Sequence, residues 1–257
     1  MLVAWQEFLK GKRKKLDVQA FGFNLTDNII RLHNNLANGN YRHGGYQEFK
    51  ISDPKPRIIH KASVRDRLLH HAIHRILYPH FDRLFICDSF SCRIGKGTHV
   101  ALNRFKRLCF KVSRNDTKTV WILKGDIRKF FASVDHEILV NIIRKRISDQ
   151  QAVGLLKQVI SSFNSGVTGK GIPLGNLTSQ IFANIYLNEL DQFLKLGLKV
   201  KNYIRYADDF VILSDNKEYL VSLIPRIKLF LEDKLKIELH PEKVFIKTLY
   251  SGIDFLG

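Results

Sequence analysis

Acidic residues are scarce in this chain of 257 residues: 24 Asp and Glu stand against 42 Lys and Arg, which gives a formal net charge of +18. This surplus exceeds what solubility needs, and the basic residues are spread along the chain instead of forming one tail. Phe, Tyr and Trp are interleaved with them, as suits a groove that neutralises phosphates and stacks on bases. The charge therefore predicts a polyanionic partner.

Cysteine is also rare. The chain has only Cys87, Cys92 and Cys109, an odd count without the spacing of a disulfide framework. This excludes a disulfide scaffold and indicates a reducing compartment. A zinc site made of these cysteines and His99 is an alternative, although the tight paired spacing of most zinc modules is missing.

Long apolar runs and low-complexity segments are absent. No stretch is long and apolar enough to span a membrane. The apolar stretch at the N-terminus is too short for a signal peptide and lacks its basic start. Hydrophobic residues make up 45% and charged residues 26%, as in folded soluble proteins. We therefore expect an intracellular protein with no membrane contact, built as one large domain or as two subdomains that share a cleft.

Helical and hairpin patterns alternate along the chain. The first forty residues are predicted to be helical, and their basic run Lys10–Lys15 is either an RNA-binding segment or, as we prefer for the run alone, a solvated helix face. Later helices are expected at about 64–78, 136–163 and 217–235, an apolar strand at 119–123, and hairpins around 52–56 and 208–209. This order suggests an α+β sheet with helices packed on one face.

Two adjacent carboxylates, Asp208 and Asp209, occupy the expected turn of the second hairpin, and Asp126 lies just past the end of the apolar strand. If the hairpin lies beside that strand, three carboxylates converge at one edge of the sheet. Magnesium prefers such oxygen ligands, and two ions can clamp the attacking and leaving oxygens of a phosphoryl displacement. For the pair alone, an ordinary acidic turn is the alternative.

Two weaker patterns accompany the carboxylates. Lys96 lies between Gly95 and Gly97 just before an expected helix, where glycines and a lysine can cradle a phosphate. His70 and His74 fall four residues apart on one helix face, but no Glu follows the first as a zinc protease motif requires. We therefore expect packed or RNA-facing histidines there.

The acidic pair also belongs to a recognisable series of motifs. Tyr206-Ala-Asp-Asp209 resembles the Y-x-D-D motif of reverse transcriptases, and their other motifs follow in order over about residues 41–257. The segment "DPKPRII" is similar to the first fingers motif, and "SFSCRIGKGTHVAL" is similar to the second. The palm strand with the first catalytic Asp is matched by "LKGDIRKFFASVDHEIL", and the template-contacting turn and helix by "GIPLGNLTSQIFANIYLNELD". The lysine motif is matched by "LKIELHPEKV" and the last palm hairpin by "IDFLG".

The resemblance implies an α+β fold of the right-hand polymerase type, with fingers and an antiparallel palm sheet backed by helices. We expect a basic helical extension over 1–40, fingers over 41–125, and a palm over 126–257 with a helical fingers-side insertion at about 136–165. A thumb is not evident. The resemblance further implies a cytoplasmic protein encoded by a bacterium, an archaeon or a phage.

The same resemblance assigns roles to residues. Asp126, Asp208 and Asp209 are expected to bind two magnesium ions (Mg2+) while a primer 3′-hydroxyl attacks the α-phosphate of a dNTP. Lys243 matches a lysine proposed to protonate pyrophosphate, with a plain surface lysine as the alternative. The residues expected to contact the dNTP are Lys55, Arg57, Phe131 as the aromatic steric gate, and Leu174. Those expected to contact template or primer are Gly175, Ser179, Gln180, Arg93, Lys96 and Tyr206.

One departure from the family pattern concerns the template-contacting motif. Most reverse transcriptases have P-Q-G-x-x-x-S-P there, whereas this chain has Leu174 in place of the glutamine and Gln180 in place of the last proline. Both changes resemble the enzymes of diversity-generating retroelements, which copy their template RNA with errors chiefly at adenines and work with a basic oligomeric accessory variability protein. Retron, group II intron and phage-defence reverse transcriptases are alternatives, as is a non-catalytic, maturase-like RNA-binding protein.

Overall fold

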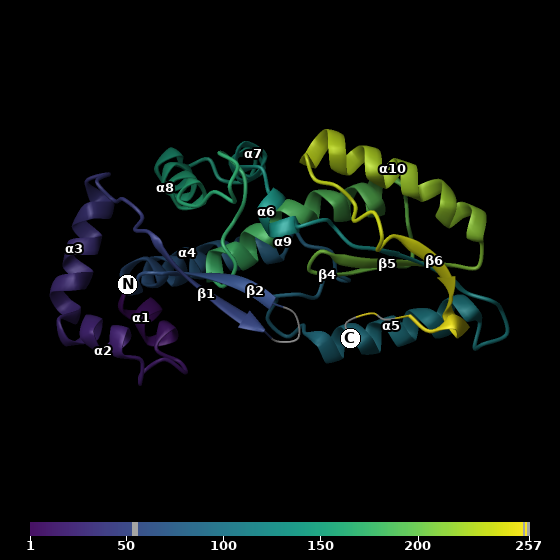
Figure 1. The fold of residues 1–257 in the computed structure, drawn as a ribbon, viewed down its shortest axis with the longest axis horizontal. Coiled ribbons are helices and arrows are strands. Elements are labelled where there is room, and N and C mark those ends of the chain that lie inside the picture. The colour runs from purple at the N-terminus through teal and green to yellow at the C-terminus, as the bar shows by residue number, and fades with distance from the viewer. Residues whose placement is uncertain (53–55, 254, 256–257) are drawn as a thin grey trace.

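The structure is a computed structural model that describes residues 1–52, 56–253 and 255. Three helices form one end of an elongated molecule: α1 (Leu2–Phe8), α2 (Leu16–Phe23) and α3 (Leu25–Ala37). The four-stranded sheet forms the other end, as Figure 1 shows. The first forty residues are mostly helical, as predicted, but the basic run Lys10–Lys15 lies in the turn between α1 and α2 and not on a helix face.

A two-stranded antiparallel sheet projects beside these helices. Strand β1 (Tyr46–Ser52) pairs with β2 (Pro56–Ala62) in the register that sets Tyr46 opposite Ala62. Most of β1 and the first three residues of β2 are exposed, which is consistent with a hairpin whose tip reaches away from the core. The hairpin was predicted from the sequence, and most of its turn falls outside the described residues.

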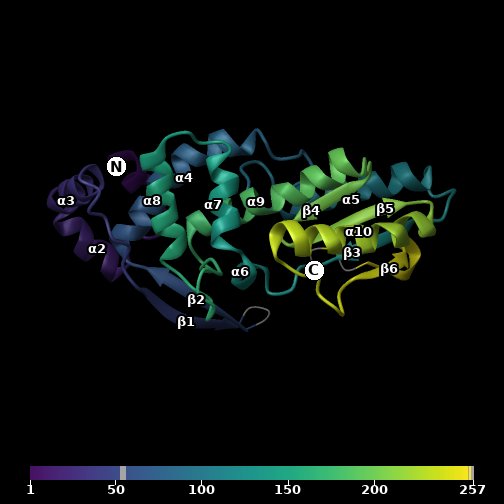
Figure 2. The ribbon, with the colours of Figure 1, turned by 90° about the horizontal axis from the view of Figure 1, so that it is seen from above.

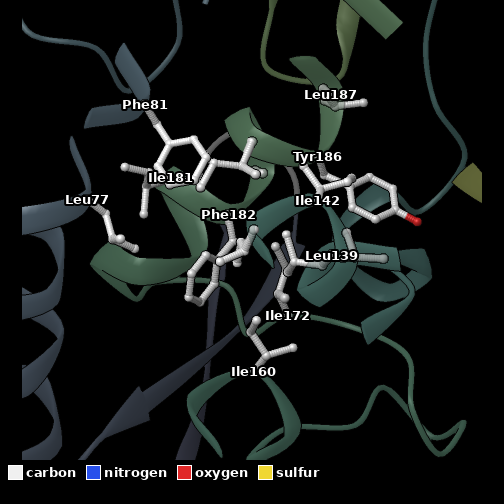
Figure 3. Packing of buried hydrophobic residues seen from close by; sticks show 14 of the residues in the cluster. Leu77, Phe81, Leu139, Ile142, Ile160, Ile172, Ile181, Phe182, Tyr186 and Leu187 are labelled. Atoms are coloured by element: carbon white, nitrogen blue, oxygen red, sulfur yellow. The ribbon is translucent and has the colours of Figure 1, made fainter. Parts of the chain in front are cut away.

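The main core is built around helix α9 (Leu177–Gln192), in which apolar residues occur on several faces. Helices α4 (Val64–Asp82), α7 (His136–Arg144) and α8 (Gln150–Ser161) surround it. Side chains at the N-termini of these three helices cap backbone amides, as expected of Ser and Asp: Ser63, Asp135 and Asp149. Figure 3 shows Phe182 between Leu77, Ile142 and Ile160, so α9 joins the helical half of the molecule together.

The larger sheet has the strand order β4 (Tyr203–Tyr206), β5 (Asp209–Ser214), β3 (Trp121–Gly125) and β6 (Phe245–Thr248), and every neighbouring pair is antiparallel. Figures 1 and 2 show α10 (Lys217–Leu235) on one face and α5 (Thr98–Ser113) on the other. Alternate strand residues pack towards the two sides: Leu123 and Ile212 belong to the main core, and Ile122 and Val211 to a second cluster under α5.

Two expectations need adjustment. The prediction that helices pack on one face only was wrong, because runs such as Ile122-Leu123 are apolar at successive positions and so need cover on both faces. The third strand begins at Trp121 and extends to Gly125, two residues later than predicted. Helix α10 has the predicted bounds, whereas α4 continues past its internal Pro79 to Asp82.

The remaining described elements are short: α6 (Phe130–Ser133), a π-helical turn η1 (Phe193–Gly197) and a 3₁₀ turn η2 (Leu249–Ser251). Across the described residues, no helix combines the length and the apolar content that crossing a bilayer requires.

Candidate active site

The acidic pair lies on a tight hairpin turn. Tyr206 pairs with Asp209, so only Ala207 and Asp208 form the loop between β4 and β5. Ala207 has a φ of 53°, the left-handed value that two-residue hairpin loops require and that glycine usually supplies. For an alanine this costs roughly 1–2 kcal/mol. The turn therefore holds Asp208 at the tip of the hairpin at some cost in backbone strain.

Asp126 is brought to the same edge by the pairing of β3 with β5. Gly125 lies opposite Phe210, and Asp126 and Asp209 are the next residues in that register. A Cβ atom on Gly125 would lie 2.2 Å from Cζ of Phe210, so only glycine lets the aromatic ring lie over the end of β3. The predicted convergence of three carboxylates at one edge of the sheet is thus present in the structure.

Burial and repulsion between carboxylates raise the pKa of Asp208 and of Asp209. Burial raises the pKa of Asp209 to about 6, and repulsion from Asp126 and Asp208 adds to this while the Lys124 ammonium opposes it. The Nζ atom of Lys124 lies 3.9 Å from Oδ1 of Asp209. Burial, together with repulsion from Asp126, also raises the pKa of Asp208. The edge therefore carries negative charge that a cation would stabilise.

The donor set fits a hard divalent cation. Oδ1 of Asp209 is buried and has no hydrogen-bond partner among the described residues. No three described His, Cys, Asp or Glu side chains are grouped tightly enough to hold a metal ion alone, and this applies to the cysteine-based zinc alternative as well. Magnesium needs no such group, because it binds through one or two carboxylates and completes its shell with water and substrate phosphates.

Two further predicted residues flank the carboxylates. Nζ of Lys243 donates to Oδ2 of Asp126 at 3.1 Å, so this lysine lies at the site. Phe131 is half-buried, and its ring packs at 74° to that of Phe130 with 5.4 Å between centroids. Its carbonyl oxygen accepts a hydrogen bond from the amide of Ile172 at 2.7 Å. The proposed gate is therefore held from both its ring and its backbone.

A cleft with a volume of about 680 Å³ lies in front of the turn. It brings together most of the residues that the sequence singled out: Arg57, Phe131, Leu174, Gly175, Ser179, Gln180, Tyr206, Asp208 and Asp209. Lys55 lies outside the described residues. The cleft is large enough for a nucleotide and part of a nucleic-acid strand, since ligand pockets typically measure about 300–1,000 Å³.

The segment with Leu174 lies directly on strand β2. The amide of His60 donates to the carbonyl oxygen of Leu174 at 3.0 Å, and Nδ2 of Asn176 donates to the carbonyl oxygen of His60 at 2.7 Å. Gly175 has a φ of +97°, and a Cβ atom there would lie 2.6 Å from Cγ2 of Ile59. Glycine is therefore required both for the conformation and for the close approach. Ser179 is buried, whereas Gln180 is exposed.

The structure does not bring Arg93 or Lys96 to the cleft lining. Nε of Arg93 donates to Oδ1 of Asp82 at 2.7 Å, its other nitrogens reach three backbone carbonyls, and the residue is buried. Nζ of Lys96 donates to the carbonyl oxygen of Cys87. Both residues brace the loop before α5. Tyr206 does line the cleft, and its hydroxyl lies 3.2 Å from Oγ1 of Thr98.

Sequence reasoning missed a fully buried ion pair behind the acidic turn. Arg205 binds Asp191 at 2.6 and 2.8 Å, and both side chains are 0% exposed. Nη1 of Arg205 also donates to the carbonyl oxygen of Ala207 at 2.9 Å, which fixes the turn from below. The available signal was an arginine at an inward position of an apolar strand, which requires a partner when buried.

The antiparallel sheet with its covering helices is the fold of a polymerase palm. Residues 50–257 match the family model described as "Reverse transcriptase (RNA-dependent DNA polymerase)", and the chain belongs to that family.

Two curated relatives show how much of a longer protein the chain spans. Protein YkfC of Escherichia coli is 27% identical over 88% of this chain and 69% of its own length. Group II intron-encoded protein LtrA of Lactococcus lactis is 26% identical over 99% of this chain, which spans only 54% of LtrA.

A solved structure shares the fold. Apo telomerase from Candida tropicalis matches with a TM-score of 0.64 at 12% identity, over 84% of this chain and 47% of that one. This likeness supports the fold alone.

Proposed function

We propose that this chain catalyses RNA-directed DNA synthesis by two-metal nucleotidyl transfer from dNTPs to a primer 3′-hydroxyl. The observation that carries the proposal is the edge formed by Asp126, Asp208 and Asp209. Burial raises the pKa of Asp208 and Asp209, these two residues line the cleft, and Oδ1 of Asp209 lacks a hydrogen-bond partner among the described residues. Two magnesium ions bound there would stabilise the charge of the attacking and leaving oxygens.

The protein's own residues then bind and orient the substrates. Arg57 presents a guanidinium to the cleft from β2, where it can bond a triphosphate bidentately. Phe131 occupies the space beside the incoming sugar, as proposed for a steric gate. Lys243, at 3.1 Å from Asp126, is close enough to the carboxylates to donate a proton to the leaving pyrophosphate.

Nucleic-acid binding follows from charge and position. The net charge of +18 favours a phosphate backbone, and Gly175 and Gln180 line the cleft beside the carboxylates. Ser179 is largely buried but lines the cleft, and its Oγ has no hydrogen-bond partner among the described residues, so it can bond a strand that enters the cleft. We propose an RNA template and a cDNA primer–template duplex as the macromolecular partners.

Primer extension on an RNA template with magnesium tests this function. We expect Asp208→Asn, which keeps the shape of the side chain but removes its charge, to lower dNTP incorporation by roughly a hundredfold or more. Asp215→Asn is the matched control, because Asp215 follows the same hairpin and, within the described part of the chain, its one ion pair is with Lys118 at 3.6 Å on the surface. Equal incorporation by wild type and Asp208→Asn would contradict the proposal. The absence of incorporation by wild type would favour the non-catalytic, maturase-like RNA-binding protein.

We further propose that synthesis is error-prone at template adenines, as in a diversity-generating retroelement. Leu174 lines the cleft where most family members have a glutamine, so its apolar side chain removes a polar group that a mismatched base pair would leave unpaired. A basic oligomeric accessory protein and a structured template RNA belong to this proposal. Sequenced products should show excess misincorporation opposite adenine that Leu174→Gln reduces, and an error spectrum equal across the four template bases would contradict it.

A group II intron-type enzyme is the second candidate, because LtrA is described as a group II intron-encoded protein and aligns with 99% of this chain. The same sequencing separates the two candidates. A low error rate without adenine bias, unchanged in Leu174→Gln, would favour the intron-type enzyme.

A further inference from the structure

A second, smaller cavity adjoins the cleft at the start of helix α9. Its volume is about 240 Å³, and it shares Gly175, Asn176 and Gln180 with the cleft. Lys12, from the N-terminal basic run, lines its other side. The cavity thus links a part of the sequence that the proposed chemistry does not use to the turn that contacts the template.

Cationic groups are crowded in this cavity. Nζ of Lys12 lies 5.1 Å from the centroid of the Phe8 ring, and the guanidinium of Arg67 lies 5.3 Å from the same centroid. His71 lines the cavity as well. Burial, with repulsion from Arg67, lowers the pKa of Lys12, and burial, with repulsion from Lys12, lowers that of His71 to about 4. With a pKa of about 4, His71 is neutral near pH 7, so the remaining repulsion is between Lys12 and Arg67, and an anion between them would remove it.

Nearby acidic groups only partly neutralise these cations. Asp17 binds Arg67 at 2.6 Å, but it also binds Lys61 at 2.7 Å. Glu7 acts on His71 from a distance and is itself paired with Arg75. The two carboxylates are therefore shared among more cations than they can neutralise, and a net positive charge remains around the cavity.

Polar groups in the cavity wall also lack partners. His70 is 1% exposed, and the structure shows no hydrogen-bond partner for its Nδ1 within the described chain. Nε of Arg67 is likewise buried and unpaired there. Asn176 is the N-cap of the 16-residue helix α9 but makes no side-chain cap, so first-turn amides are left for another acceptor.

We propose that this cavity binds one phosphate of the template strand that runs out of the cleft over Gln180. The inference rests on the proposed function. The small volume suits one phosphodiester group better than a triphosphate. A strand is favoured over a free anion because the cavity and the cleft share three residues, so a backbone that leaves the cleft there enters the cavity directly. Lys12 and Arg67 would neutralise the phosphate, and the α9 amides would donate to it.

A phosphate scan on the whole protein tests the site. The probe is a primer–template with a single-stranded 5′ extension of the template, in which an uncharged methylphosphonate replaces each phosphate in turn. Binding is measured by fluorescence anisotropy with EDTA present, so that no synthesis occurs. We expect one position at which wild type loses affinity on the order of severalfold at low salt, because the uncharged linkage removes one phosphate contact and the counterion release that accompanies it.

The Lys12→Gln variant then decides the assignment. We expect it to bind the unmodified probe less tightly and to show no further loss at that one position. Lys14→Gln is the matched control, because Lys14 is in the same basic run but does not line the cavity, and it should keep the positional loss. Lys12→Met, also read by thermal unfolding, serves if Lys12→Gln fails to fold, because it removes the charge but keeps an apolar side chain beside the Phe8 ring.

Three results would overturn the inference: a loss spread evenly over all phosphates, an identical scan for Lys12→Gln and Lys14→Gln, or full competition by inorganic phosphate without positional effect. Its failure is distinguishable from that of the proposed function. If the protein extends primers but Lys12→Gln does not abolish the loss at one phosphate position, only the phosphate site is contradicted. If Lys12→Gln abolishes that loss in a protein that cannot extend primers, only the catalytic proposal is contradicted.

Discussion

At the residue scale, Arg205 and Asp191 show how the acidic turn is fixed, because one buried guanidinium binds both a carboxylate and the carbonyl oxygen of Ala207. Asp191→Asn would leave a charged group buried without its counter-ion. We expect this substitution to lower the free energy of unfolding by about 3–5 kcal/mol, measured by urea denaturation. Breaking the exposed pair Lys228–Glu232 by Lys228→Ala should cost about 0.5 kcal/mol or less. Similar losses from both substitutions would contradict the assigned role of Arg205.

Asp209 gives the molecule a pH dependence of known sign. Its pKa is raised to about 6, so the metal-free protein is stabilised by the protonated carboxyl at low pH and loses that contribution as the pH rises through about 6. Asp209→Asn should therefore stabilise the metal-free protein at about pH 8, by an amount of order 1–3 kcal/mol, and change little at about pH 4. Chemical denaturation in EDTA across this range measures it. Asp215→Asn is the control, and destabilisation by Asp209→Asn at high pH would refute the repulsion argument.

At the scale of elements, the contact between the turn at 173–176 and strand β2 depends on one glycine. Gly175→Ala places a methyl group against Ile59 in a left-handed conformation, so we expect a loss of about 1–3 kcal/mol and a weaker dNTP interaction, seen as a raised KM in primer extension. Gly39→Ala, with a φ of +68° and open space around it, isolates the conformational cost. Equal effects on KM would show that the contact with β2 is irrelevant to nucleotide binding.

Elements with a strong local pattern were predicted well from the sequence. Helix α10 has an Asn216 cap and apolar residues at helical spacing, and the carboxylates could be placed because a strand end and a hairpin turn fix where Asp126, Asp208 and Asp209 lie. What failed depended on partners distant in the chain. Arg93 was expected to contact the template, yet its side chain binds Asp82 and backbone carbonyl oxygens. The local sequence of its loop does not predict these partners. The pairing of Arg205 with Asp191 likewise becomes visible only when β4 packs on α9.

At the scale of the whole molecule, the positive charge should make binding strongly dependent on salt. If six to ten phosphates are neutralised, the affinity for a primer–template should fall by about 10³–10⁵ between roughly 50 and 200 mM salt. Anisotropy titrations over that range measure the slope, with an uncharged peptide nucleic acid duplex as the control ligand. A slope near zero would mean that the surplus charge serves another purpose than binding nucleic acid.

The hydrogen bonds of His60 have a mechanical consequence. Its amide and carbonyl both bind the turn that carries Leu174, and Arg57 lies three residues earlier on the same strand. If Arg57 binds the triphosphate as proposed, a displacement of β2 towards the nucleotide moves the turn with Leu174 in the same direction. A substitution that loosens the hydrogen bonds between β2 and this turn is then expected to change nucleotide binding and the error spectrum together.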